Sequence, residues 1–502
     1  MSSASTQPFP TVAPTPLAVP TAAFEVLGYL CVVAVGTLSY VIGWLTPNQA
    51  GVLTVLLLSL LIVLAWKRFD QGRHPCFLFL CTLLLFQGGR LIGFCLGVTP
   101  DPLDIDLFTP APFSIPREDA GIVLLAIALS AICVYAPCRW NYRCIQPPQD
   151  QAVRRYLPYL YVVFFFTISA ALVKNYLYFR YALDHGYLSF FNDYYRLAAT
   201  IPLPVRLVAL LDLPVFIAIF VIEKRKKPLW VTTALYLGVA TLYLATGSRG
   251  YTLSFALALW YVARIKSSKP TRILVPLLLV AILICVAVVV DATRQSAAGD
   301  QRYYLGPTQF IAQQGNSLNV TELAIKYKDL FRPHIGSYLF NELWGAFVPA
   351  DISRYVPGRS LSWDLVVFLN PSLSGLGFGT GGSYLGEMYL LGGLGGVIVL
   401  SLVLGYGLNL MYACGSNAWA LIVVALILPD FLLMPRGDNV EWLSALMRNA
   451  ILFCPLLVGW WLFSLLSSLR SPSPRTLPPG AGMIRPTPEP RKLAPSVSET
   501  GK

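Results

Sequence analysis

Arg249 combines a residue type and a setting that suit the binding of a phosphate. It lies in Thr246-Gly247-Ser248-Arg249-Gly250, a tight turn between two apolar stretches. The two neighbouring glycines let a ligand approach the backbone, and the free amide groups at the start of the following helix add positive potential. These features suit the binding of an anion better than a role in packing, so we interpret Arg249 as a candidate anion-binding residue.

Arg436 and Glu387 are two further charges placed beside or inside apolar stretches. Arg436 lies in a second short turn, Met434-Pro435-Arg436-Gly437-Asp438, and Glu387 lies inside a long apolar stretch. A charge at the centre of a bilayer costs roughly 2.5–3.5 kcal/mol on insertion scales, so it usually faces a partner or a cavity. For Glu387, an ion pair with an arginine, a protonated buried acid and a functional carboxylate all remain open. The glycines that follow it, at positions 392, 393, 395 and 396, predict close helix packing, with a flexible segment as the alternative.

The sequence contains no motif for a metal or a nucleotide cofactor. The three histidines, His74, His185 and His334, are far apart and form neither an HxxxH nor an HExxH pattern. Cys138 and Cys144 have no further ligand beside them in the sequence, so we expect no zinc there. A phosphate-binding Walker loop and a dinucleotide fingerprint are also absent, which argues against an ATP-driven pump. We therefore expect neither a metal nor a cofactor.

The elements that must position these residues are membrane helices. Of the 502 residues, 56% are hydrophobic and only 12% are charged, about half the charged fraction of a soluble domain. A membrane-spanning helix needs about 20 apolar residues, and the sequence predicts an all-α, polytopic membrane protein with about twelve such helices. The predicted spans are 22–45, 50–66, 75–98, 119–137, 157–173, 206–222, 229–246, 250–263, 273–290, 381–410, 417–434 and 443–466.

The distribution of basic residues predicts the orientation of the chain. With a cytoplasmic N-terminus, the cytoplasmic segments carry 21 Lys and Arg against 5 Asp and Glu, whereas the rest of the chain carries 16 against 20. Since basic residues favour the cytoplasmic side, both termini are predicted to be cytoplasmic. We interpret the basic runs as topology anchors beside anionic lipid, so we expect the lipid bilayer, and no nucleic acid, as a partner.

This topology divides the chain into one membrane domain and two tails. Residues 22–466 form the predicted membrane domain. Residues 1–21 and the Pro- and Ser-rich residues 467–502 are expected to be disordered cytoplasmic segments.

Two external segments are large enough to carry function. A loop of about 90 residues at 291–380, between the ninth and tenth predicted helices, contains Arg302 and Arg332, and loops of this length are usually functional. The segment 174–205 is rich in Tyr and Phe. This richness predicts either an interfacial aromatic belt or a surface that stacks on sugar rings.

Three motifs resemble those of bacterial Wzy-type O-antigen and oligosaccharide repeat-unit polymerases, which are related to the O-antigen ligases. They are Thr246-Gly247-Ser248-Arg249-Gly250, Gln313-Gln314-Gly315-Asn316-Ser317-Leu318 in the long external loop, and Gly382-Ser383-Tyr384-Leu385-Gly386-Glu387-Met388-Tyr389. The likeness in layout covers roughly residues 22–466. It implies a helical bundle like that of GT-C glycosyltransferases in the bacterial inner membrane, with a periplasmic active site.

The resemblance also implies a reaction. A growing glycan on undecaprenyl pyrophosphate would be transferred to a newly flipped lipid-linked repeat unit, with release of undecaprenyl pyrophosphate, in the biosynthesis of O-antigen, capsule or exopolysaccharide. Arg249 and Glu387 are then the expected catalytic residues, and Glu387 would orient an arginine or act as the general base. Arg249, Arg436, Arg302 and Arg332 are expected to bind the substrate or its pyrophosphate. A chain-length regulator and a flippase are candidate protein partners.

Two alternatives remain open. An O-antigen ligase transfers the finished glycan to another acceptor and has the same architecture. Ligases have a histidine in the external loop, and the predicted external loop of this chain contains His334. A polysaccharide or solute transporter would suit about twelve helices, but such carriers often contain two repeated halves, and no repeat is detectable on either side of residue 250.

Overall fold

The computed structural model describes residues 18–69, 71–99, 103, 115–140, 142, 144–148, 152–186, 189–190, 193–246, 250–267, 271–297, 306–345, 360–371 and 380–470. The chain forms two compact units, Met1–Leu456 and Leu457–Lys502. Every residue of the candidate site lies in the first unit. The predicted disordered segments 1–21 and 467–502 lie almost entirely outside the described residues.

The described residues form helices and no strand, which confirms the predicted all-α class. The α-helices are α1 (Ala18–Val41), α2 (Pro47–Arg68), α3 (Pro75–Cys95), α4 (Arg117–Trp140), α5 (Leu157–His185), α7 (Tyr194–Thr200), α8 (Leu203–Ala209), α9 (Asp212–Ile222), α10 (Lys226–Ala245), α11 (Gly250–Lys266), α12 (Leu274–Ala297), α13 (Pro307–Gln314), α14 (Asn316–Lys326), α15 (Lys328–Phe331), α16 (Ile335–Gly345), α18 (Leu361–Leu369), α20 (Tyr384–Cys414), α21 (Ala418–Leu433) and α22 (Glu441–Arg470). Three 3-10 helices are η1 (Ala152–Tyr156), η2 (Arg332–His334) and η3 (Met434–Arg436).

Each of the twelve predicted spans coincides with helical structure. Ten helices of the described chain are long and apolar enough to cross a membrane. The other two predicted spans fall on α11, which has 17 residues, and on the apolar part of α12, Leu274–Val290, which is also short. The structure therefore confirms a polytopic membrane protein, whereas the number twelve stays a prediction.

One predicted boundary is wrong, and one predicted span is interrupted. The helix predicted at 157–173 continues to His185 as α5, so the aromatic segment 174–205 begins inside this helix. Its Tyr178 packs on Phe190 with ring centroids 5.5 Å apart, and both side chains are buried. The span predicted at 206–222 is divided into α8 and α9 by a break at residues 210–211.

Helix α20 contains a break that changes the interpretation of its glycines. Gly392 and Gly393 have non-helical backbone angles, and Gly393 has a φ of +61°, which favours glycine. A Cβ atom on Gly392, Gly393 or Gly395 would meet nothing within 4 Å. The prediction that these three glycines permit close helix packing is therefore wrong, because two of them form a kink.

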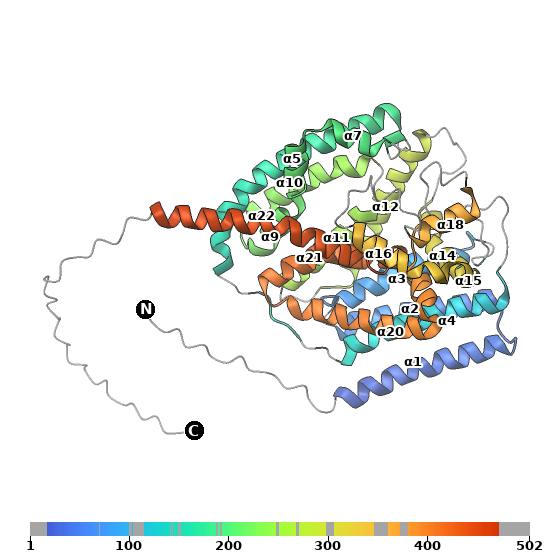
Figure 1. The fold of residues 1–502 in the computed structure, drawn as a ribbon. Helices are drawn as coiled ribbons and strands as arrows, with labels where there is room; N and C mark the ends of the chain where they lie inside the picture. The colour runs from blue at the N-terminus through green and yellow to red at the C-terminus, as the bar shows by residue number, and fades with distance from the viewer. Residues whose placement is uncertain are drawn as a thin grey trace, which may run out of the picture. The chain divides into compact units, whose positions relative to one another are not determined.

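The core is centred on α4, which packs against α20, α1 and α2; Figure 1 shows α4 beside α20. A Cβ atom on Gly405 would lie 2.4 Å from the backbone oxygen of Val134, so glycine lets the two helices cross at close range. Ser130 on α4 forms hydrogen bonds of 2.8 Å with Tyr384 and with Ser401 on α20. Packing and buried hydrogen bonds together fix the position of α20, which contains Glu387.

Candidate functional site

The first turn of α20 meets the turn between α21 and α22. The backbone N–H of Gly382 donates to the backbone oxygen of Arg436 at 3.0 Å. A Cβ atom on Gly382 would lie 2.7 Å from Oδ1 of Asp438 and from the carbonyl carbon of Gly437. Only glycine allows this approach, and the approach places Glu387 and Arg436 on elements in direct contact.

A buried hydrogen-bond network holds four elements together beneath this contact. The Gln87 side chain on α3 donates from Nε2 to Ser383 Oγ at 3.0 Å and to the backbone oxygen of Pro435 at 2.7 Å. Thr321 on α14 donates to Gln87 Oε1 at 3.1 Å and lies 2.6 Å from Ser383 Oγ. Ser383 also caps α20 by accepting from the Gly386 N–H at 3.4 Å. We call Gln87, Thr321, Ser383 and Pro435 the Gln87 network.

The motif Gln313–Leu318, which belongs to the loop predicted to be external, packs directly on α3. A Cβ atom on Gly315 would lie 2.1 Å from the backbone nitrogen of Arg90, and one on Gly89 would lie 2.4 Å from the backbone oxygen of Ile311. The two glycines therefore face each other at the junction of α13 and α14 with α3. This contact brings a loop motif and a membrane helix, far apart in the sequence, to one place.

Arg436 is exposed, and two contacts orient its guanidinium group. Its Nη1 donates to Oε1 of Gln314, a member of the loop motif. Its Cζ atom lies 5.9 Å from the centre of the Phe86 ring, within range of a cation–π interaction. A fixed, exposed guanidinium is suited to bind a phosphate or a carboxylate.

Glu387 is fully buried, with 0% of its surface exposed. Its Oε2 accepts from the backbone N–H of Asn439 at 2.8 Å, and Asn439 Nδ2 donates to the backbone oxygen of Tyr384 at 3.1 Å. Within the described residues, no salt bridge joins Glu387 to an arginine. Its ionisable neighbours are instead two acids, Glu342 of α16 and Asp438. One carboxylate oxygen of each lies within 4.8 Å of the other and of a Glu387 oxygen. Burial, with a further contribution from Asp438, raises the pKa of Glu342 far above its usual range.

Among the described residues, Arg332 is the remaining predicted arginine, and it does not join this contact. Arg332 is exposed, and its Nε donates to the backbone oxygen of Leu390 at 3.2 Å, next to the kink in α20. Arg249 and Arg302 lie outside the described residues, so their predicted roles stay predictions.

Sequence reasoning missed most of the polar residues around Glu387 and Arg436. Gln87 is a neutral residue in an apolar helix, and Thr321 lies in a loop of mixed composition. Glu342 and Asp438 lie in predicted external segments, where acidic residues are common. They are 45 and 51 residues from Glu387 along the chain, so the sequence gives no sign that the three side chains meet. One feature of the sequence could have indicated this network. A polar side chain buried in an apolar helix must find hydrogen-bond partners, so Gln87 implies polar groups close to it.

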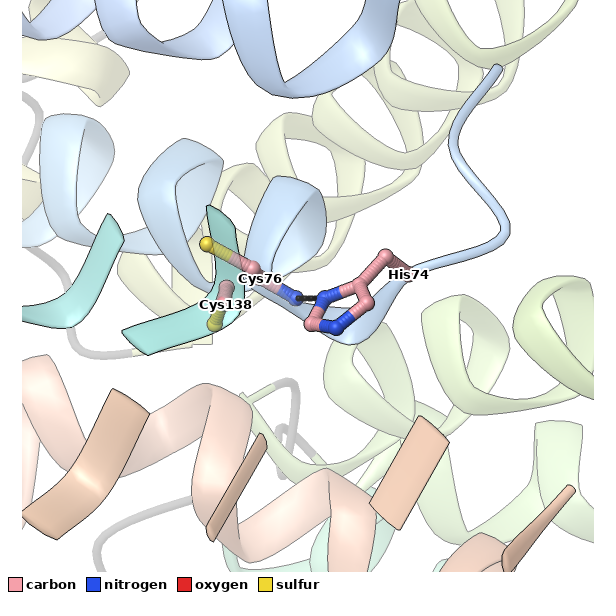
Figure 2. A group of neighbouring side chains, drawn as sticks. All are labelled: His74, Cys76 and Cys138. Carbon is pink, nitrogen blue, oxygen red and sulfur yellow. Dashed lines mark hydrogen bonds between the residues drawn. The ribbon is translucent and has the colours of Figure 1, made fainter. Parts of the chain in front are cut away.

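One group of possible metal ligands lies elsewhere in the fold. His74, Cys76 and Cys138 each offer a ligand atom within 4.8 Å of the others (Figure 2). Nδ1 of His74 accepts from the Cys76 N–H at 3.2 Å and caps α3, while Nε2 lies 3.4 Å from Oδ1 of Asn409. The Cys138 thiol donates to the backbone oxygen of Gly405 at 3.3 Å. Because both His74 nitrogens and the Cys138 thiol are engaged within the protein, the group fits a helix cap better than a metal centre.

An apolar groove lies between α1, α2 and α4. It has a volume of about 680 Å³ and is lined mainly by aliphatic side chains, with Arg117 and Glu118 among the few charged residues. Arg117 donates to the backbone oxygens of Tyr40 at 2.8 Å and Leu45 at 2.9 Å, so its guanidinium is fixed at one end of α4. The groove suits a hydrocarbon chain.

Comparison with known proteins identifies the family. The family model for the O-antigen polysaccharide polymerase Wzy matches residues 26–466. No curated protein and no solved structure matches the chain. The family match covers nearly the whole membrane domain and includes the three motifs that carry the resemblance in the sequence. The chain therefore belongs to the O-antigen polysaccharide polymerase Wzy family, a glycosyltransferase-type family of multi-pass bacterial membrane proteins that polymerises lipid-linked oligosaccharide repeat units.

Proposed function

We propose that the protein polymerises undecaprenyl-pyrophosphate-linked repeat units at the periplasmic face of the inner membrane. The family match carries this proposal. The position of the candidate site supports it, because Glu387 and Arg436 lie at the helix ends that the charge distribution assigns to the external side. Both termini are then cytoplasmic.

The reaction transfers the growing glycan from one lipid carrier to another. The bond between the anomeric carbon of the glycan and the pyrophosphate oxygen breaks, and undecaprenyl pyrophosphate leaves with the bonding electrons. A hydroxyl oxygen of the acceptor sugar forms the new glycosidic bond, and its proton passes to a base or to the substrate itself. Cleavage of the glycosyl–pyrophosphate bond supplies the free energy, so no nucleotide sugar enters.

The arginines supply positive charge where negative charge develops on the leaving group. Arg436 is exposed and oriented by Gln314 and Phe86, which suits electrostatic stabilisation of a pyrophosphate. We propose that Arg249 is its partner in the Ser-Arg-Gly turn and that Arg302 and Arg332 contact the glycan or headgroup more peripherally. The groove between α1, α2 and α4 suits part of a polyprenyl chain.

Glu387 suits a positioning role better than a direct contact with the substrate. It is fully buried, and it holds the Asn439 backbone in the turn that carries Arg436. The predicted alternative, that Glu387 is the general base, would require the substrate hydroxyl to reach a side chain without exposed surface. We therefore propose that Glu387 acts through the turn and the position of Arg436.

The experiment is complementation of cells that lack the protein, with the length of the glycan as the readout. Arg249→Ala and Arg249→Lys, and likewise Arg436→Ala and Arg436→Lys, should each shorten the polymer at unchanged protein level. Loss of one fixed donor typically lowers kcat about 10²–10³-fold, and lysine keeps the charge but loses the planar fork. Arg180→Ala is the control, because Arg180 is largely exposed and its salt bridge within the described residues is with Asp184 at 3.8 Å. Wild-type chain length in both alanine variants would remove these arginines from the mechanism.

Cells without the protein also separate a polymerase from a ligase. Single repeat units attached to the final acceptor are expected for a polymerase, whereas long chains that stay on the lipid carrier would indicate a ligase. A flippase that delivers repeat units and a regulator of chain length are the protein partners that we propose for this reaction.

A further inference from the structure

Three carboxylates from three separate segments converge beside the turn that carries Arg436. Glu342 lies on α16, Asp438 lies between η3 and α22, and Glu387 enters from the first turns of α20. Each offers a carboxylate oxygen, and these oxygens all lie within 4.8 Å of one another. We call Glu342, Glu387 and Asp438 the carboxylate triad.

The triad has no cation of its own among the described residues. No Lys, Arg or His in the described part of the chain forms a salt bridge with any of these carboxylates. Arg436 is only two residues from Asp438, but its Nη1 is directed at Gln314. Three like charges in a poorly hydrated place repel one another strongly, so the native state needs either a cation or protons at this point.

Fully buried Glu387 is the clearest sign that something else binds here. Its Oε2 accepts from the Asn439 N–H at 2.8 Å, whereas its buried Oε1 has no hydrogen-bond partner. Oε2 of Glu342 and Oδ1 of Asp438 are also buried and unpaired, and so is the amide oxygen of Asn439. A buried oxygen left without a partner is destabilising, and four such oxygens on neighbouring side chains form an oxygen-rich place that the nearby donors do not satisfy.

The geometry and the donor type fit one class of ligand. Oxygen ligands lie about 2.0–2.1 Å from Mg²⁺ and about 2.3–2.6 Å from Ca²⁺, so two oxygens on one ion are at most about 4–5 Å apart. The triad oxygens satisfy this limit. The triad offers carboxylates and neither a nitrogen nor a sulfur ligand, which favours Mg²⁺, Ca²⁺ or Mn²⁺ over zinc. We propose that Glu342, Glu387 and Asp438 bind one divalent cation of this hard, oxygen-preferring class.

Such a cation would tie the external loop to the membrane helices. It would bridge α16, α20 and the turn between α21 and α22, and so it would fix the backbone that carries Arg436. It would also add positive charge beside the proposed pyrophosphate site; this second role rests on the proposed function, whereas binding of the cation does not.

The test measures binding directly on the purified full-length protein in detergent. The protein is freed of metal with EDTA, exchanged into EDTA-free buffer and titrated with Mn²⁺, whose free form is followed by its electron paramagnetic resonance signal. One Mn²⁺ per chain is expected, displaced by Mg²⁺ or Ca²⁺. Glu342→Gln, Glu387→Gln and Asp438→Asn should each weaken the affinity at least about tenfold. Asp329→Asn is the matched control, because Asp329 is an exposed acid of the same loop.

A second measurement follows the thermal unfolding of the wild-type protein and of the triad variants. Saturating Mn²⁺ or Mg²⁺ should raise the unfolding midpoint of the wild-type protein by a few °C, since a ligand of the native state stabilises it, and the triad variants should lose this rise. If the wild-type protein binds no Mn²⁺, or the triad variants bind it as well as Asp329→Asn does, the proposal is refuted. A midpoint that rises in Glu342→Gln without any metal would show that the acids share protons instead. None of these readouts uses the glycan, so the polymerase proposal can fail independently.

Discussion

Replacement of Gly315 by alanine tests whether the external-loop motif is seated on α3. The added Cβ atom would lie 2.1 Å from the backbone nitrogen of Arg90 and 2.9 Å from Cα of Gly89. These are backbone atoms of a helix, so no flexible side chain can move aside. Forced overpacking of this kind costs about 1–3 kcal/mol, and we expect the unfolding midpoint of the purified protein to fall by about 2–6 °C.

The matched control is Gly336→Ala in α16 of the same loop, where a Cβ atom would meet nothing within 4 Å. That variant should keep the wild-type midpoint or exceed it slightly, because alanine favours a helix over glycine. Gly315→Ala should also shorten the glycan, since Gln314 orients Arg436. Gly89→Ala should act at the same contact, so the double variant with Gly315→Ala should lose less stability than the two single losses combined. Equal midpoints for Gly315→Ala and Gly336→Ala would refute the seating of the motif.

Three further predictions concern other parts of the fold. Gln87→Leu should destabilise the protein by about 1–3 kcal/mol and shorten the glycan, because the hydroxyls of the Gln87 network and the Pro435 oxygen lose their partner; unchanged denaturation would contradict this. Gly393→Ala should cost about 1–2 kcal/mol in the same assay because of its φ of +61°, whereas Gly395→Ala, with open space around it, should not. Glu223 is desolvated, but its hydrogen bonds to Arg225 and Tyr161 prevail and lower its pKa to about 2. Its contribution to stability is therefore complete above about pH 4.5 and is lost toward pH 2, so Glu223→Gln should flatten the melting midpoint over that range; an unchanged pH profile would be evidence against it.

The fold was predictable where apolar length decides the outcome. Every predicted span falls on a helix, because some 20 apolar residues have few stable alternatives to a helix in lipid. The errors occur where tertiary packing or the backbone angles of single residues decide where a helix ends. Helix α5 extends twelve residues past its predicted end, and Tyr178 in this extension packs on Phe190. Helix α20 breaks at Gly392 and Gly393, and the composition of the segment does not show where the backbone leaves the helical angles.

The site was predictable only where a single residue was out of place. Glu387 and Arg436 could be named as candidates because a charge in an apolar setting is visible at one position in the sequence. The partners of Glu387 are not visible in this way, because Glu342 and Asp438 belong to predicted external segments, where acidic residues are common.

The predicted external loop 291–380 also shows that composition does not reveal which charged side chains meet in the fold. It carries seven basic and seven acidic residues and predicts a neutral surface. A net charge is an average over a whole segment, whereas a binding site depends on which few charges the fold directs to one point. Within the described residues, Arg332 of this loop is directed at Leu390, while Glu342 is directed at Glu387 and Asp438. These two described side chains of the loop, one basic and one acidic, are thus directed to different places, and Glu342 joins the acids that a divalent cation would neutralise.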